Sequence, residues 1–233
     1  MTALHIDIWS DIACPWCYVG KRRLEAALGD LPERETVRIR WRAFELNPTA
    51  ARQTETGPYA ERLAKKYGTS LDEAQSRLGR LVELAQADGL RLDFERIRPG
   101  NTFDAHRIVH LAAERGLQDA VKERFLRGYL SEGEAIGEPE VLVRLAAEAG
   151  LAAEEVRSVL ASGAHADAVR ADERIAQELG IRGVPFFVLG ERYAVSGAQP
   201  VALFASALRR TLDELAQGTA PFEEGAACGP DGC

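Results

Sequence analysis

Two cysteines separated by two residues, placed between a predicted strand and a predicted helix, constrain this chain more than any other feature. The segment runs from Cys14 to Cys17 in the order Cys-Pro-Trp-Cys. Residues 4–9 before it alternate in polarity, which is typical of a β-strand. Residues 18–29 after it have the apolar spacing of an amphipathic helix. Two thiols within one helical turn at such a junction predict a reversible dithiol–disulfide site.

The helix N-terminus explains why this spacing suits redox chemistry. Its unpaired N–H groups and the positive end of the helix dipole stabilise an anion, so we expect the Cys14 thiol to ionise at a lower pH than a free thiol. Pro15 is favoured at the first helical position, where its missing N–H costs nothing. Cys17 lies one turn on and can attack a mixed disulfide on Cys14. We therefore predict Cys14 as the catalytic nucleophile and Cys17 as the catalytic resolving thiol.

Other interpretations of this segment stay open. The two cysteines could form a structural disulfide, or they could supply half of a zinc site. Trp16 lies between them, and we expect it to be partly exposed, where its ring would contact an unfolded substrate or tune the thiolate environment. A packed aromatic side chain is the alternative for Trp16.

Composition excludes several classes of function. The chain has 233 residues, of which 46% are hydrophobic and 28% charged, as in a globular protein of one or two domains. The net charge of -7 gives no support to binding of nucleic acids or anionic membranes. No apolar run approaches the ~20 residues needed to span a bilayer. We therefore expect no nucleic acid and no membrane among the partners, no cofactor and no metal.

The beginning of the sequence bears on the cellular compartment. Met1 to Ala3 lead almost directly into the first predicted strand, without the pattern of a secretory signal. We therefore expect a cytoplasmic protein, in a compartment where thiols are normally kept reduced. Four cysteines in two close pairs then indicate catalytic, sensing or metal-binding thiols. A mature secreted form, already without its leader, is the alternative.

The order of predicted elements indicates a sheet that is interrupted by a helical block. A second strand is predicted over residues 36–44. Between about residues 57 and 163 the apolar period becomes helical, with Gly and Pro breaks. A helix over 166–179, a hairpin over 184–196 and a helix over 200–216 complete the pattern. Without the helical block, a mixed four-stranded sheet flanked by helices remains, which is an α/β fold.

This pattern predicts three parts of the chain. Residues 1–48 and 164–217 would form a discontinuous sheet domain, and residues 49–163 a helical insertion domain. Residues 218–233 have the small-residue and acidic composition of a flexible tail.

The arrangement resembles the thioredoxin-like fold of the DsbA family, which carries a large all-helical insertion. The resemblance rests on the Cys-Pro-Trp-Cys segment at 14–17 and on the pair Val184-Pro185. In that family the proline is cis and faces the dithiol, which implies that Val184 and Pro185 bind the substrate backbone. A trans proline opening an edge strand is the alternative.

Further stretches are similar to the FrnE group within that family. They are residues 9–11, 44–48, 101–102, 105–107, 183–187 and 196–199. The resemblance covers about residues 4–217. It places Pro15, Asn101, Thr102 and His106 in the vicinity of the active site.

The resemblance implies a protein thiol–disulfide oxidoreductase or disulfide isomerase. Its partners would be protein substrates with disulfides or thiols, with glutathione or a thioredoxin-type protein as reductant. Repair of wrongly oxidised proteins under oxidative or metal stress follows as a hypothesis. Glutathione-dependent 2-hydroxychromene-2-carboxylate isomerases and kappa-class transferases share the fold but typically carry Ser in place of Cys14. That class, and a non-catalytic redox sensor or thiolate metal binder, remain the alternatives.

A second pair of cysteines, Cys228 and Cys233, closes the sequence. The Gly-Pro-Asp-Gly between them favours a turn that lets the two thiols meet. A bridge across so short a loop at a chain end constrains almost none of the fold. We therefore predict a second redox-active disulfide, Cys228–Cys233. Thiolate binding of a soft metal, a four-cysteine zinc site with the first pair, and an idle tail are the alternatives.

Other polar side chains near the predicted site carry weaker signals. His106 and His110 are four residues apart on a helix, a spacing that can bind metal, but no third ligand is evident. Asp7 and Asp11 flank the first strand, and either carboxylate could relay the proton of Cys17. Solvated or capping carboxylates are the alternative for both.

Overall fold

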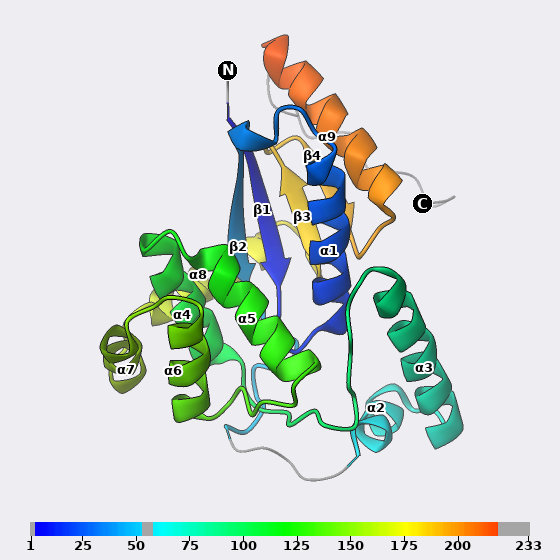
Figure 1. Ribbon diagram of the computed structural model, residues 1–233, viewed down its shortest axis with the longest axis vertical. Coiled ribbons are helices and arrows are strands. Elements are labelled where there is room, and N and C mark those ends of the chain that lie inside the picture. The colour runs from blue at the N-terminus through cyan, green and yellow to red at the C-terminus, as the bar shows by residue number, and fades with distance from the viewer. Residues whose placement is uncertain (1–2, 53–57, 219–233) are drawn as a thin grey trace.

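The computed structural model describes residues 3–52 and 58–218, and its centre is a mixed four-stranded sheet (Figure 1). The strands lie in the order β2-β1-β3-β4. Their bounds are β1 Leu4–Ser10, β2 Val37–Ala43, β3 Phe186–Leu189 and β4 Tyr193–Ser196. β1 and β2 are parallel, whereas β3 is antiparallel to both β1 and β4. The predicted α/β fold with a mixed sheet of four strands is thereby confirmed.

The two faces of β1 bury different residues because successive side chains point to opposite sides of the sheet. Ile6 and Ile8 face the main hydrophobic core. Trp9 faces a smaller cluster that includes Ala176 and Ile181. Both faces are therefore covered, as expected for the central strand of a sheet with helices on each side.

Helices from the two ends of the chain pack on the face of the main core. Helix α1 (Pro15–Gly29) contacts α9 (Val201–Ala216), which also contacts β1, β3 and β4. The rings of Phe187 in β3 and Phe204 in α9 meet edge to face, with their centroids 4.8 Å apart. On the other face, α8 (Ala166–Glu178) packs against β2.

The predicted helical insertion is present between β2 and α8. Figure 1 shows its helices on the side of the molecule where the arrowheads of β1 and β2 lie, and beside those strands. They are α2 Tyr59–Tyr67, α3 Leu71–Ala87, α4 Phe103–Glu114, α5 Gln118–Leu130, α6 Pro139–Glu148 and α7 Ala153–Ala161. One apolar core continues from Ile8 in β1 to Phe125 in α5 and Leu142 in α6. The boundaries of the sheet domain, the insertion and the tail remain predictions.

Helix α5 is attached to β2 by polar contacts to Trp41. The Gln118 side chain accepts a hydrogen bond from the Trp41 backbone N–H (2.9 Å) and donates one to the Trp41 carbonyl oxygen (3.0 Å). The indole Nε1 of Trp41 donates to Asp119 (2.9 Å). These contacts hold one helix of the insertion against an edge strand of the sheet.

Candidate active site

The two cysteines of the Cys-Pro-Trp-Cys segment lie where the sheet passes into α1. Cys14 is the N-cap residue of α1 with an extended backbone, and Pro15 occupies the first helical position. The Cys17 N–H donates to the Cys14 carbonyl oxygen (3.0 Å), which closes the first turn. Both residues carry free thiols. Cys14 is 4% exposed and Cys17 is 0% exposed, so Cys14 is the thiol nearer to solvent.

A loop far along the chain covers Cys14. The Val184–Pro185 peptide bond is cis. The Cys14 thiol donates a hydrogen bond to the Val184 carbonyl oxygen, with 3.4 Å between Sγ and O. Gly20 in α1 leaves room for the Pro185 ring, which lies against the helix. The fold therefore brings Cys14 next to Val184 and Pro185, although Cys14 and Val184 are 170 positions apart in the sequence.

The two thiols differ in acidity, and the difference corrects the expectation from the sequence. The pKa of Cys14 is raised because its thiol is hydrogen-bonded to Cys17, because it is buried and because the Asp11 carboxylate is near. Burial also raises the pKa of Cys17, but the Cys14 thiol, the Lys122 ammonium and the Ser10 hydroxyl outweigh it and lower that pKa. The two sulfurs share a hydrogen bond and titrate as a pair, and the groups that favour a thiolate, Lys122 and Ser10, act on Cys17. The helix N-terminus alone did not predict this, because it says nothing about burial.

Lys122 is a part of this site that the sequence analysis missed. It lies in α5, is fully buried, and its Nζ donates to the Ser10 carbonyl oxygen (3.2 Å) at the end of β1. Burial lowers its pKa to about 8, while the nearby Cys17, Asp11 and Cys14 favour its charged form. A sequence signal exists, because Lys122 precedes Leu126 by four residues and so lies on the same helix face as an apolar side chain.

Asp11 is a buried carboxylate beside the dithiol. It accepts hydrogen bonds from the backbone N–H groups of Leu46 (2.8 Å) and Ala13 (3.3 Å). The Nε2 atom of His106 lies 3.4 Å from Asp11 Oδ1. Burial raises the pKa of Asp11, but His106, the Leu46 N–H and Thr102 lower it to a net value below its usual range.

His106 is the neutral partner of this carboxylate. It is 1% exposed, and burial together with the charge of Lys122 lowers its pKa despite the attraction of Asp11. The structure thus brings the predicted vicinity residues Thr102 and His106 next to the loop that leads from β1 to Cys14.

Asn101 contacts a neighbouring loop instead of the thiols. Its side chain donates to Glu45 (3.3 Å) and to the Pro48 carbonyl oxygen (3.4 Å), and it accepts from the Phe103 N–H (2.9 Å). It therefore positions the segment after β2 relative to the start of α4.

Asp7 and His110, two of the weaker candidates from the sequence, contact other charged side chains away from the thiols. Asp7 accepts from Arg40 (2.6 Å) and Arg42 (2.8 Å) on the sheet, so a role as proton relay for Cys17 is not supported for Asp7. His110 Nε2 lies 2.9 Å from Asp172. Within residues 3–52 and 58–218, no group of three or more His, Cys, Asp or Glu side chains is arranged to hold a metal ion.

The surface around the dithiol is partly apolar. Trp16 is 42% exposed, as the sequence predicts, and Leu46 after β2 is 38% exposed. The Leu46 backbone is bonded to Asp11, so the loop that carries this side chain is fixed beside the dithiol.

Cys228 and Cys233 lie outside the described residues, and their pairing stays a prediction. Among the described residues, no helix is long and apolar enough to cross a membrane.

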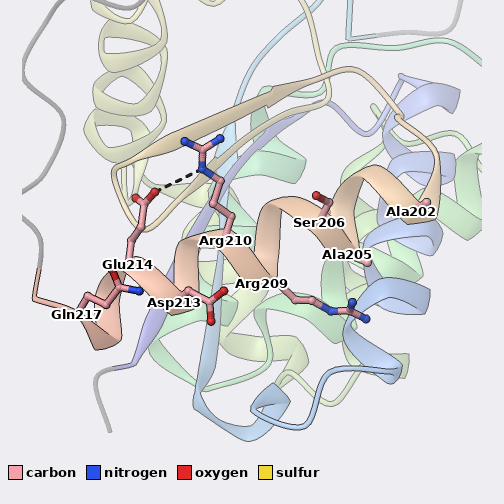
Figure 2. A pocket seen from close by; sticks show the side chains of 8 residues that line it. All are labelled: Ala202, Ala205, Ser206, Arg209, Arg210, Asp213, Glu214 and Gln217. Atoms are coloured by element: carbon pink, nitrogen blue, oxygen red, sulfur yellow. Dashed lines mark hydrogen bonds and ion pairs between the residues drawn. The ribbon is translucent and has the colours of Figure 1, made fainter.

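An open pocket of about 700 Å³ lies along the outer face of α9, and Figure 2 shows the side chains around it. Arg209, Arg210, Asp213 and Glu214 line it together with small residues of the same helix. Glu214 pairs with Arg210 across the helix surface. The pocket contains neither a thiol nor any residue of the dithiol site.

Comparisons with known proteins agree with this geometry. The family model of the DSBA-like thioredoxin domain matches residues 5–209. The crystal structure of a probable DsbA oxidoreductase from Streptomyces coelicolor is 47% identical, with a TM-score of 0.86, and the match covers 99% of this chain and 98% of that one. The uncharacterized protein YwbO of Bacillus subtilis is 27% identical over 209 residues, which are 88% of this chain and 96% of that protein.

A more distant structure shares the fold. It is the cytosolic disulfide reductase DsbM from Pseudomonas aeruginosa with GSH, which is 19% identical with a TM-score of 0.61. The match covers 90% of this chain and 99% of DsbM.

Proposed function

We propose, since this chain belongs to the DSBA-like thioredoxin domain family of thiol–disulfide oxidoreductases, that it exchanges disulfides with protein substrates through Cys14 and Cys17. The observation that carries the proposal is the position of Cys14. Cys14 is the N-cap residue of α1 and the less buried of the two cysteines, and its thiol donates to the Val184 carbonyl oxygen next to the exposed Trp16.

The proposed reaction begins with attack on a substrate disulfide. The Cys14 thiol passes its proton to the Cys17 thiolate, and the resulting Cys14 thiolate attacks one substrate sulfur. The other substrate sulfur leaves as a thiolate and takes a proton from water. The product is a mixed disulfide between Cys14 and the substrate.

Cys17 completes the exchange. It loses its proton and attacks the Cys14 sulfur, which expels the second substrate sulfur as a thiolate that is then protonated. The Cys14–Cys17 disulfide forms, and two electrons have passed from the protein to the substrate. Of the two protons that the substrate thiols gain, the dithiol supplies one and water the other. The same steps in reverse oxidise a substrate dithiol.

Substrate recognition would use the surface next to Cys14. The Val184 carbonyl oxygen accepts from the Cys14 thiol in the resting state, and we propose that it accepts from a substrate backbone N–H when Cys14 enters a mixed disulfide. Pro185 would fix the direction of that carbonyl. Trp16 and Leu46 would provide apolar contact to an unfolded segment.

We place the protein in the cytoplasm as a reductase or isomerase. A reducing compartment favours a reduced dithiol, which an isomerase needs in order to begin. Repair of wrongly oxidised proteins during oxidative or metal stress would fit this direction. Glutathione is our candidate reductant, because the DsbM structure, which shares the fold, is described as a cytosolic disulfide reductase with GSH.

A second redox pair would cooperate with the first. We propose that Cys228 and Cys233 form a disulfide that exchanges with Cys14–Cys17 or with substrate. Replacing both C-terminal cysteines by serine tests this role. Slower reoxidation or reduction of Cys14–Cys17 in the double variant would support it, and unchanged exchange would contradict it.

Single serine variants test the central proposal. With a protein disulfide such as insulin and glutathione as reductant, Cys14→Ser should abolish turnover. Cys17→Ser should turn over more slowly and accumulate a mixed disulfide, because without Cys17 only glutathione from solution can resolve it. Mass spectrometry after acid trapping detects the adduct.

Two results would contradict the proposal. Full turnover in Cys17→Ser together with tight glutathione binding would favour a glutathione-dependent isomerase or transferase. No turnover in the unmodified protein, with stoichiometric metal bound by its thiols, would favour a sensor or metal binder.

A further inference from the structure

Two buried lysines of this chain differ in how their charge is neutralised. Lys21 in α1 is almost fully buried, and it is paired with Glu25, Asp119 and Glu123. Lys122 is completely buried, and among the residues that the structure describes no carboxylate lies within ion-pair distance of its Nζ. Its contacts are the Ser10 carbonyl oxygen at 3.2 Å and the face of the Trp41 ring, 5.6 Å from Nζ to the centroid.

An ammonium group without a paired anion is expensive to bury. A carbonyl oxygen and an aromatic face stabilise it less than a carboxylate does, so the remaining cost appears as a lowered pKa of about 8. A methionine or leucine would fill the same space without this cost. The charge at this position therefore calls for an explanation other than packing.

The surroundings of Lys122 point to the dithiol. The carbonyl that it binds belongs to Ser10, the last residue of β1 and four positions before Cys14. Cys17 is the group that most favours the charged form of Lys122, followed by Asp11 and Cys14.

Asp11, His106 and Tyr59 of α2 are titratable groups that also lie near the thiols. Burial and the nearby Cys14 raise the pKa of Tyr59 to about 12, so its hydroxyl is neutral at neutral pH. Asp11 receives N–H donors from Leu46 and Ala13 and faces His106. His106 is buried and its pKa is lowered, so it does not supply a positive charge at neutral pH. Lys122 is therefore a buried positive charge that acts on the thiols from the helical insertion.

We propose that Lys122 is a positioning residue for the dithiol chemistry, and that its ammonium group stabilises the Cys17 thiolate and so sets the balance between the dithiol and disulfide forms. This inference rests on the proposed function of Cys14 and Cys17. The thiolate exists only in the reduced protein, so the Lys122 charge stabilises the reduced form over the disulfide. Through Lys122 of α5, the insertion thereby makes the Cys14–Cys17 disulfide a stronger oxidant than it would be without this charge.

The variant Lys122→Met tests this role because it keeps the length of the side chain and removes the charge. Arg124→Met is the matched control: Arg124 is a largely buried cation of the same helix, but its partners are Glu132 and Glu148. For each protein the equilibrium with reduced and oxidised glutathione is measured by thiol trapping. Thiolate absorbance near 240 nm is followed against pH in the same samples.

We expect Lys122→Met to raise the pKa of the first thiol and to shift the glutathione equilibrium about tenfold toward the disulfide, equivalent to about 30 mV. Arg124→Met should change neither value. An unchanged equilibrium and an unchanged thiol pKa in folded Lys122→Met would overturn the inference. Absence of a reversible Cys14–Cys17 disulfide in the unmodified protein would instead contradict the proposed function.

A measurement on the unmodified protein applies even if Lys122→Met fails to fold. The chain has four lysines, Lys21, Lys65, Lys66 and Lys122, so ¹³C-labelled lysine gives few side-chain signals. Oxidation of the dithiol removes the thiolate and should lower the pKa read from the Lys122 Cε signal. The signals of Lys65 and Lys66 should not move. A Lys122 signal with the same titration in both redox states would also overturn the inference.

Discussion

Gly20 in the middle of α1 lies directly against Pro185, so that a methyl group on Gly20 would be 3.0 Å from the proline Cγ atom. The same methyl group would be 3.1 Å from the Phe187 ring. A glycine inside a helix normally costs stability. Here it permits the close approach of α1 to the start of β3, and hence the contact between Cys14 and Val184.

Gly20→Ala should destabilise the protein by about 1–3 kcal/mol, because Pro185 and Phe187 must shift to admit the methyl group. It should also weaken substrate turnover, since Pro185 adjoins Cys14. Gly79→Ala in α3 is the control, because nothing lies within 4 Å of the added methyl group. That change should stabilise the helix by about 0.5–1 kcal/mol. Urea unfolding measures the free energy of unfolding of both variants. Equal changes in the two variants would refute the role of Gly20 in the contact with Pro185.

Asp172→Ala should destabilise the protein by about 3–5 kcal/mol because it leaves buried partners without their anion. The Asp172 carboxylate, which is 1% exposed, accepts from Arg42 (2.8 Å) and from the Ala43 N–H (2.9 Å) and faces His110 (2.9 Å). Asp167→Ala, at an exposed position of the same helix, should cost much less. Denaturant midpoints compare the two variants, and a similar loss in both would mean that the buried network contributes little.

The pair Asp11 and His106 should make the fold sensitive to mild acid. Both folded-state pKa values are lowered, so in each case the unfolded chain binds its proton at a higher pH. The unfolded His106 has a pKa near its ordinary value of 6.5. Its contribution to stability is therefore complete above about pH 6.5 and declines as the pH falls toward the folded-state pKa. Asp11 adds a further loss of folding stability as the pH falls below 3.8, the ordinary pKa of an aspartate side chain.

His106→Gln tests this dependence. The free energy of unfolding should fall between pH 7 and pH 5 in the unmodified protein, and the slope should be smaller in the variant. An equal slope in both proteins would show that His106 is not the group responsible.

Trp16→Ala should reduce kcat/KM for an unfolded protein disulfide by about tenfold, because the indole ring supplies apolar contact worth ~1.5 kcal/mol or more. The equilibrium with glutathione should change little, since Trp16 contributes no charge to the thiols. Tyr67→Ala removes a 58% exposed aromatic ring of α2 and should leave both values unchanged. Unaltered kinetics in Trp16→Ala would argue against a substrate contact.

The parts of the site that sequence could predict are those built by neighbouring residues. Cys14, Pro15 and Cys17 lie on one helical turn, and strand alternation before them fixes where that helix begins. The four strands also follow from local patterns, whereas their order and direction in the sheet depend on pairing between distant segments such as β1 and β3. The positions of these elements along the chain need only short-range information.

The electrostatics of the site depends on contacts that local patterns do not contain. Lys122 reaches Ser10, which lies 112 residues earlier in the sequence, because α5 packs on β2. Strand parity could not say that Asp7 would meet arginines while Asp11 meets His106. The hydrogen bond from Cys17 and the burial of Cys14 likewise raise the pKa of Cys14, against the effect of the helix N-terminus.

The contact between Gln118 and Trp41 has a consequence for solubility. β2 lies at the edge of the sheet, where unpaired backbone groups can bind a strand of another molecule. The Gln118 amide takes up both backbone groups of Trp41, as a neighbouring strand would. Arg38 and Arg40, on the same strand, add positive charge along that edge. Through Gln118, the helical insertion thus also hinders pairing of β2 with a strand of another molecule.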